Sequence, residues 1–159
     1  MKNQAGLTLV ELLAVIVILG ILAAIAVPSI LGIIQNTRID AVKADAITVL
    51  NMAKLEVSSN AVKYDKDIEK SSTNPKSVVL DNTTLATYLD GGSFKKLTGT
   101  GDYSVTVTKN GSNYEFKLNT KAAAIEVGNK AIQFKDATLE NINDWDNKTS
   151  TTEIILSTK

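Results

Sequence analysis

The sequence contains neither cysteine nor histidine. Without cysteine, no disulfide bond can cross-link the fold. Without histidine, the chain lacks the commonest general base, a common transition-metal ligand and a member of most nucleophilic triads. Carboxylates and lysines remain available, but they form no recognisable catalytic pattern. We therefore expect no enzymatic activity, and nothing in the pattern of residues indicates a cofactor.

An excess of one charge is absent as well. The 17 basic and 17 acidic residues give a formal net charge of zero. Bulk electrostatic binding to nucleic acid usually needs a clear basic excess, so the composition does not support nucleic acid as a partner. The length of 159 residues is enough for one globular domain with a modest core.

A long apolar run near the N-terminus is the most prominent feature of the chain. No charged side chain occurs from Leu12 to Thr37. Residues 7–27 form a helix of roughly 31 Å at 1.5 Å per residue, which matches a hydrocarbon core of about 30 Å. Pro28 removes one backbone donor, and Gly20 weakens a helix by about 1 kcal/mol relative to alanine. We expect the helix to break, bend or melt at these two residues.

Three interpretations account for this run. It is long enough to be a simple transmembrane anchor. A secretory signal peptide, cleaved near residues 24–26, is a second interpretation. Against it, Glu11 lies where such a peptide would carry only positive charge, Lys2 is the single basic residue before the run, and the run continues past the cleavage point.

The third interpretation rests on the residues that precede the run. A polar leader ends at Gly6 and is followed by Leu7, Thr8 and, at the fifth position, Glu11. Pro28 is the twenty-second residue after Gly6. This arrangement resembles the prepilin processing motif of type IV pilins and pilin-like proteins, although the residue after the cut is commonly phenylalanine there. The resemblance implies cleavage between Gly6 and Leu7 and N-methylation of Leu7 by a prepilin peptidase/methyltransferase.

Glu11 has a specific role in this interpretation. A carboxylate inside an apolar segment costs about 2–3 kcal/mol or more. Cleavage creates a free α-amino group on Leu7, about 6 Å along the helix axis from Glu11. Pairing with this amine, on a neighbouring copy, would fix the register of assembly, and we assign Glu11 and Thr8 to this role. The alternative is that Glu11 lies among lipid headgroups, where the dipole of the helix N-terminus favours it.

The resemblance also implies what the chain does. It implies a structural subunit of an extracellular type IV pilus, a homo-oligomeric helical filament with possible roles in adhesion, surface motility or biofilms. The subunit would span the cytoplasmic membrane once, with its globular part outside, contact membrane lipid, and be assembled by a platform and ATPase system. A pseudopilin of a competence or type II secretion system is the alternative, and an uncleaved membrane-anchored binding domain is a second. Because it has no cysteine, the chain resembles the type IV pilins of Gram-positive bacteria more closely than others.

The expected fold is α+β, with a long N-terminal helix packed on a small antiparallel sheet. We expect a leader at 1–6, an apolar transmembrane and filament-core helix at 7–35, and a globular head at 36–159. The head would comprise an amphipathic helix at 36–58, a variable loop at 59–100 and an antiparallel sheet at 101–159. The apolar stripe of the amphipathic helix recurs every three or four residues: Ile39, Val42, Ala46, Val49, Leu50, Ala53 and Val57.

Within the head, residues 103–107 and 114–118 alternate apolar and polar positions, and Asn110-Gly111 between them predicts a hairpin with a type I′ turn. Further strands are expected at 131–134, 153–156 and 122–127. A short helix capped by Asn82 or Thr83 is expected to end at the glycine pair 91–92.

One acidic turn is a weak candidate for a calcium site. Asp144 and Asp146 flank Trp145 near the C-terminus, but the spacing of an EF-hand loop is missing. A solvated turn is the better interpretation, and we expect no metal site.

Overall fold

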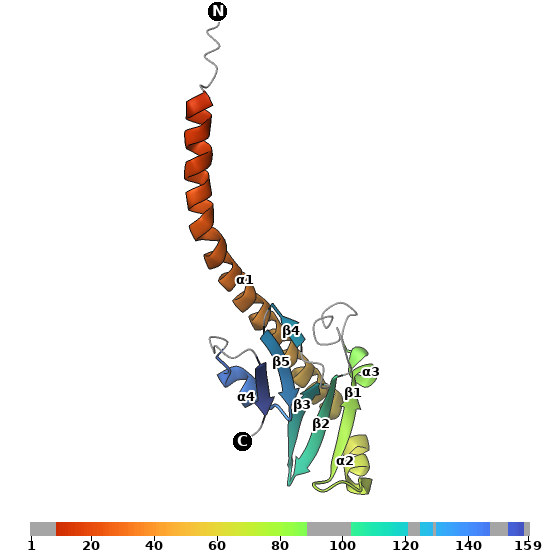
Figure 1. The fold of residues 1–159 in the computed structure, drawn as a ribbon. Coiled ribbons are helices and arrows are strands. Elements are labelled where there is room, and N and C mark those ends of the chain that lie inside the picture. Colours follow the sequence, from red (N-terminus) through yellow and green to blue (C-terminus); the bar gives the residue numbers. More distant parts are fainter. Residues whose placement is uncertain (1–8, 89–102, 121–124, 129, 147–152, 158–159) are drawn as a thin grey trace, which may run out of the picture. The chain divides into compact units, whose positions relative to one another are not determined.

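The computed structural model describes residues 9–88, 103–120, 125–128, 130–146 and 153–157 (Figure 1). The chain divides into two compact units, Met1–Thr37 and Arg38–Lys159. Helix α1 (Leu9–Ser59) contributes to both units. We call the second unit the head, and we call residues 9–34 of α1 the apolar segment.

The apolar segment is not covered by any described part of the chain. Its most apolar window of 18 residues has a mean hydropathy of 3.0, and none of that window is buried. The large apolar side chains from Leu9 to Ile34 are all 43–79% exposed. Among the described helices, α1 alone is long enough and apolar enough to cross a membrane, by length and composition.

The later part of α1 lies in the core of the head. All seven residues of the predicted apolar stripe, from Ile39 to Val57, are at most 1% exposed. The helix ends at Ser59, one residue beyond the predicted end at residue 58. The amphipathic helix is therefore confirmed, because a stripe repeating every three to four residues has one face on which it can be buried.

The first sheet has the order β1-β2-β3 and is antiparallel throughout. Its strands are β1 (Ser77–Asp81), β2 (Tyr103–Asn110) and β3 (Asn113–Thr120). The predicted hairpin is confirmed, but its turn is displaced by one residue, because Asn110 pairs with Asn113 and the loop is Gly111-Ser112. A type I′ turn needs a positive φ at both loop residues, and here only Gly111 has one, at 62°. That pattern fits a type II′ turn instead.

The second sheet has the order β4-β5-β6. Its strands are β4 (Ile125–Val127), β5 (Lys130–Lys135) and β6 (Glu153–Ser157). The strands expected at 131–134 and 153–156 are confirmed, as is the described part of the one expected at 122–127, whose residues 122–124 lie outside the described residues. The antiparallel pairing expected over 101–159 holds for β2 with β3 and for β4 with β5, but β5 and β6 run parallel. Helix α4 (Leu139–Asp144) lies between them in sequence, and such a crossover is the connection that parallel strands need.

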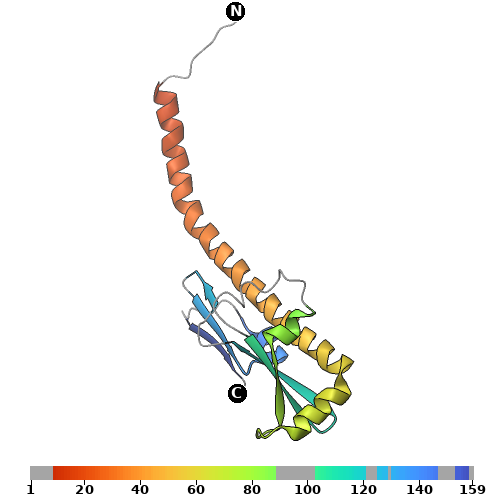
Figure 2. The same cartoon turned by 90° about the vertical axis from the view of Figure 1, so that its right-hand side faces the viewer.

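The two sheets are joined where β3 meets the end of β5 (Figure 2). The amides and carbonyls of Leu118 and Ala137 exchange two hydrogen bonds, of 2.8 and 3.0 Å. Beside this bridge, the amide of Phe134 donates to the Thr120 hydroxyl at 3.1 Å. The core therefore continues from one sheet to the other, and Phe134 and Leu118 are both fully buried in it.

A side chain completes this junction. The Asn119 side-chain oxygen accepts from the amide of Asp136 at 2.8 Å, and its nitrogen donates to the Asp136 carboxylate at 3.1 Å. Asp136 has a φ of 53°, a left-handed conformation that aspartate tolerates better than most residues. The side chain of Asn119 thus takes the place of the backbone hydrogen bonds that pair neighbouring strands in a regular sheet.

The variable loop expected over 59–100 contains more regular structure than predicted. Helix α2 (Ala61–Lys70) and strand β1 lie within it, and the short helix expected there is present as α3 (Asn82–Ala86). The cap of α3 is Asp81, whose carboxylate accepts from the amide of Thr84 at 2.9 Å. The predicted end of that helix at residues 91–92 lies outside the described residues. Helix α2 was not predicted, because its residues are mostly charged and only two of them, Tyr64 and Ile68, are buried.

We predict that Asn119→Ala destabilises the head by about 1–3 kcal/mol, because the amide of Asp136 would lose its acceptor in a part-buried site. Asn113→Ala, on the same strand but exposed beside the turn, is the matched control and should stay within about 0.5 kcal/mol of wild type. Urea unfolding of the full chain in detergent micelles, followed by circular dichroism, measures both. Equal midpoints for the two variants would show that Asn119 does not hold the junction.

Candidate assembly site on the apolar helix

The predicted processing residues lie outside the described part of the chain. Gly6, Leu7 and Thr8 precede the first described residue, Leu9. Cleavage between Gly6 and Leu7, N-methylation of Leu7 and the register role of Thr8 therefore stay predictions.

Glu11 lies in the first turn of α1, and its neighbours Val10 and Leu12 are 73% and 58% exposed. It is the single charged residue of the apolar segment. At the N-terminus of a helix, the dipole favours a carboxylate by about 0.3–1 kcal/mol at an exposed site. The dipole thus accounts for part of its placement, and a pairing with the Leu7 amine of another copy stays a prediction.

Gly20 and Pro28 both lie inside α1, and the helix runs through them without interruption from Leu9 to Ser59. The predicted break is therefore not present in the single chain. No heavy atom lies within 4 Å of the position that a Cβ on Gly20 would take, so nothing in the chain itself excludes a larger residue there. Melting or bending on assembly is a property of the assembled state and stays a prediction.

The apolar segment is a surface that water disfavours strongly. Seventeen large apolar side chains are exposed along it, from Leu9 to Ile34. Burial of each such side chain is worth about 1.5–3 kcal/mol. Contiguous exposed apolar surface of this extent marks contact with a membrane or another protein. The segment therefore needs lipid or other subunits around it.

The acidic turn gives little support to the calcium candidate. Asp144 ends α4, Asp146 follows Trp145, and both aspartates are exposed. Among the described residues, no group of three or more acidic, histidine or cysteine side chains could hold a metal ion. The structure thus adds no ligand to the two that the sequence had indicated.

A buried carboxylate at the end of α1 was missed by the sequence analysis. Glu56 is 6% exposed, and the Tyr64 hydroxyl of α2 donates to it at 2.5 Å. The side-chain nitrogen of Asn60 also donates to it, at 3.2 Å. These contacts fix the angle between the last turn of α1 and α2. A glutamate one residue before the apolar Val57 looks like a solvent-facing position in the sequence, so only the fold reveals its burial.

The hydrogen bonds of Glu56 outweigh the cost of its burial. Burial raises the pKa of this carboxyl group. Hydrogen bonds from Tyr64, Tyr88 and Asn60 and the charge of Lys63 lower it by more than burial raises it, so the pKa lies below the ordinary glutamate value. Burial, and after it the hydrogen bond to Glu56, raise the pKa of the Tyr64 hydroxyl. Glu56 is therefore ionised and Tyr64 neutral at physiological pH.

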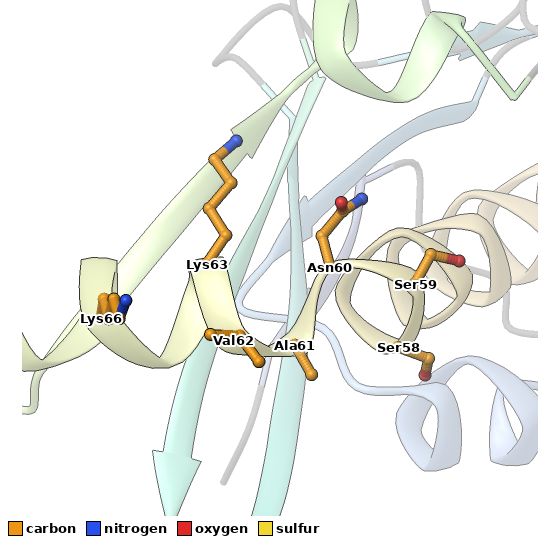
Figure 3. A pocket seen from close by; sticks show the side chains of 7 residues that line it. All are labelled: Ser58, Ser59, Asn60, Ala61, Val62, Lys63 and Lys66. Atoms are coloured by element: carbon orange, nitrogen blue, oxygen red, sulfur yellow. The ribbon is translucent and has the colours of Figure 1, made fainter.

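A depression beside this cluster does not form a binding site. It is lined by Ser58, Ser59, Asn60, Ala61, Val62, Lys63 and Lys66. Figure 3 shows that these side chains point in different directions, with Lys63 directed away from the two serines. A ligand site needs a few convergent polar groups. The depression marks the junction of α1 and α2, and it brings no set of polar groups together.

A second polar contact connects α2 to the hairpin. The Asp65 carboxylate accepts from the Lys109 ammonium at 2.7 Å and from the Tyr114 hydroxyl. Hydrogen bonds from Lys109 and Tyr114 lower the pKa of Asp65. Because both charged side chains are about one third exposed, solvent screens the pair and its contribution to stability is small.

We predict that Glu56→Gln destabilises the head by about 1–2 kcal/mol at pH 7, because hydrogen bonds to a charged acceptor are stronger than those to an amide. The folded pKa of Glu56 is lowered, so its contribution is present above the ordinary value of 4.5 and is lost as the pH falls through the folded pKa. The difference between wild type and variant should therefore shrink at pH 3.

Thermal unfolding in micelles at pH 7 and pH 3 measures this difference. Glu126→Gln makes the same chemical change at an exposed position of β4 and should leave the midpoint nearly unchanged at both pH values. A difference for Glu56→Gln that is equally large at pH 3 would contradict the assignment of the effect to the charge of Glu56.

Comparison with known proteins extends these observations. Residues 1–27 match the family model described as the prokaryotic N-terminal methylation motif. The chain is 35% identical over 108 residues to a fimbrial protein of Pseudomonas aeruginosa, an alignment that covers 67% of this chain and 66% of the relative. It is 33% identical over 100 residues to the type II secretion system core protein G of Aeromonas hydrophila, covering 60% and 66%.

A third relative is the type IV major alpha-pilin of Moraxella bovis, 32% identical over 105 residues, which cover 58% of this chain and 66% of the relative. The chain thus spans just under two thirds of the length of these relatives. No solved structure gives a significant match. The methylation motif, the long apolar helix packed at its far end on a small antiparallel sheet, and these relatives agree: the chain belongs to the type IV pilin-like family.

Proposed function

We propose that the chain is a structural, non-enzymatic subunit of an extracellular type IV pilus. The observation that carries this proposal is the apolar segment, which is exposed along its length in the described chain and carries one carboxylate near its start. Such a surface is suited to two successive environments, first lipid and then the apolar segments of other copies. The family model over residues 1–27 supports the same proposal.

In the membrane stage, the apolar segment spans the bilayer and the head lies outside. Its 26 residues exceed the roughly 20 that a span requires. Arg38 and Asp40 follow closely after it, as expected where a helix leaves the hydrocarbon region. A prepilin peptidase/methyltransferase then cleaves after Gly6 and methylates Leu7.

In the filament stage, the apolar segments of several copies pack against each other and exclude lipid. A pilus assembly platform with its ATPase would extract each subunit from the membrane. Hydrophobic contact alone does not fix how far one helix is displaced along another. Glu11 supplies that specificity if it pairs with the Leu7 amine of a neighbour, because a carboxylate buried without a partner costs about 3–5 kcal/mol.

The alternative is a pseudopilin of a competence or type II secretion system. Relatives of similar identity include a type II secretion system core protein G, and the same apolar segment serves both kinds of filament. An uncleaved, monomeric, membrane-anchored binding domain is a second alternative. The expected similarity to cysteine-free pilins of Gram-positive bacteria stays a prediction.

We predict that filaments sheared from the cell surface contain this chain in the processed form. Intact-mass measurement should find a chain that begins at Leu7 and carries one methyl group. Recovery of the processed chain from the envelope but not from sheared filaments, with loss of secretion or DNA uptake on deletion, would support the pseudopilin. A chain that still begins at Met1 would exclude both filament functions.

We predict that Glu11→Ala leaves cleavage and membrane insertion intact but lowers incorporation into filaments at least tenfold, because the neighbour's amine would lose its partner. Quantitative mass spectrometry of the membrane and filament fractions measures the ratio. Glu126→Ala, at an exposed position of β4 in the head, is the control and should assemble as wild type does. Normal filaments from the Glu11 variant would show that the carboxylate has no part in register.

A further inference from the structure

Lys43 makes the longest-range polar contact that we find among the described residues of the head. It extends from α1, and its Nζ donates to the carbonyl oxygen of Asn143 at 2.8 Å and to that of Trp145 at 3.1 Å. These residues lie 100 and 102 positions further along the chain. One side chain of the N-terminal helix thus holds the C-terminal part of the head.

The two carbonyls belong to the C-terminal end of α4. Asn143 is in the last turn of this helix and Trp145 is its C-cap. The final carbonyls of a helix have no partner within the helix, and they form the negative end of its dipole. An ammonium group suits such a helix end in two ways: it donates hydrogen bonds to the unpartnered carbonyls, and its positive charge interacts favourably with the negative end of the dipole.

The other end of α4 is fixed independently. The hydroxyl of Thr138 accepts from the amide of Asn141, whose side-chain oxygen accepts in return from the amide of Thr138, which completes a capping box. Ile142 between the two ends is fully buried. The short helix is therefore held at its start by its own cap, in its middle by the core, and at its end by Lys43.

The end of α4 determines where the chain sets out toward its next strand. After it, the chain must cross to β6, which runs parallel to β5 and is the last strand among the described residues. Trp145 begins this crossing and is 8% exposed, although its Nε1 has no hydrogen-bond partner among the described residues. Its position is thus set by packing and by the contact of its backbone with Lys43.

We propose that Lys43 fixes the end of α4 to α1, in the place of a disulfide bond or a bound metal ion. The chain has no cysteine with which to form a covalent closure. The carbonyls that a cation would bind at the end of α4 are bound by the ammonium group of Lys43. Asp144 and Asp146 are exposed beside this turn. This inference concerns the head alone and does not depend on the proposed filament.

Trp145 provides a direct test, because it is the single tryptophan of the chain. We expect Lys43→Met, in the full chain in detergent micelles, to shift tryptophan emission to longer wavelength and to raise the acrylamide quenching constant at least twofold. The thermal midpoint should fall by about 5 °C or more. Lys54→Met makes the same change on the same helix, at a similarly half-buried position, and should match wild type in all three measurements.

Emission, quenching and midpoint equal to those of Lys54→Met would overturn the proposal. If Lys43→Met does not fold, Lys43→Gln retains a neutral donor and should show quenching between that of wild type and that of the unfolded chain. Quenching equal to wild type for this variant would show that the charge is not required.

A metal-ion experiment tests the second part of the proposal. The thermal midpoint of the wild-type chain in EDTA should agree with its midpoint in millimolar calcium chloride to within about 1 °C. A clear fall in EDTA or a clear rise in calcium would show that a metal ion closes this segment, and would overturn the assignment to Lys43.

Discussion

The division of one helix between two surroundings is the constraint on which the rest of the structure depends. In the head, α1 presents a stripe from Ile39 to Val57 that is buried against two sheets. In the apolar segment, the same helix presents large apolar side chains on all sides, and none of the described residues covers them. The hydrophobic effect therefore folds the head and leaves the apolar segment dependent on lipid or on other subunits.

The head achieves its closure with polar side chains because cysteine is absent. Asn119 completes the junction of the two sheets, Glu56 fixes α2 to the end of α1, and Lys43 holds the end of α4. Each of these residues satisfies backbone or hydroxyl groups that would be costly to bury alone. Distributed hydrogen bonds of this kind are each modest, but together they define one arrangement of the elements.

Sequence reasoning located the features that depend on local pattern. The apolar stripe of α1, the hairpin of β2 and β3, and the strands β4, β5 and β6 were all predicted, because periodicity records which face of an element is buried. Helix α2 was missed, since its alternating charges conceal the two buried positions Tyr64 and Ile68. The turn at Gly111 was placed one residue early, because register depends on pairing along the whole hairpin.

The sequence by itself determined that this protein has an apolar helix with a processing motif and a separate head, because composition and short-range spacing are sufficient for both. Only the tertiary structure decided which polar residues matter inside the head. Lys43 and Glu56 look like ordinary solvated charges on an amphipathic helix. Their partners are brought to them by the fold, in the case of Lys43 from 100 residues away, and contacts at that separation leave no periodic signal in the chain.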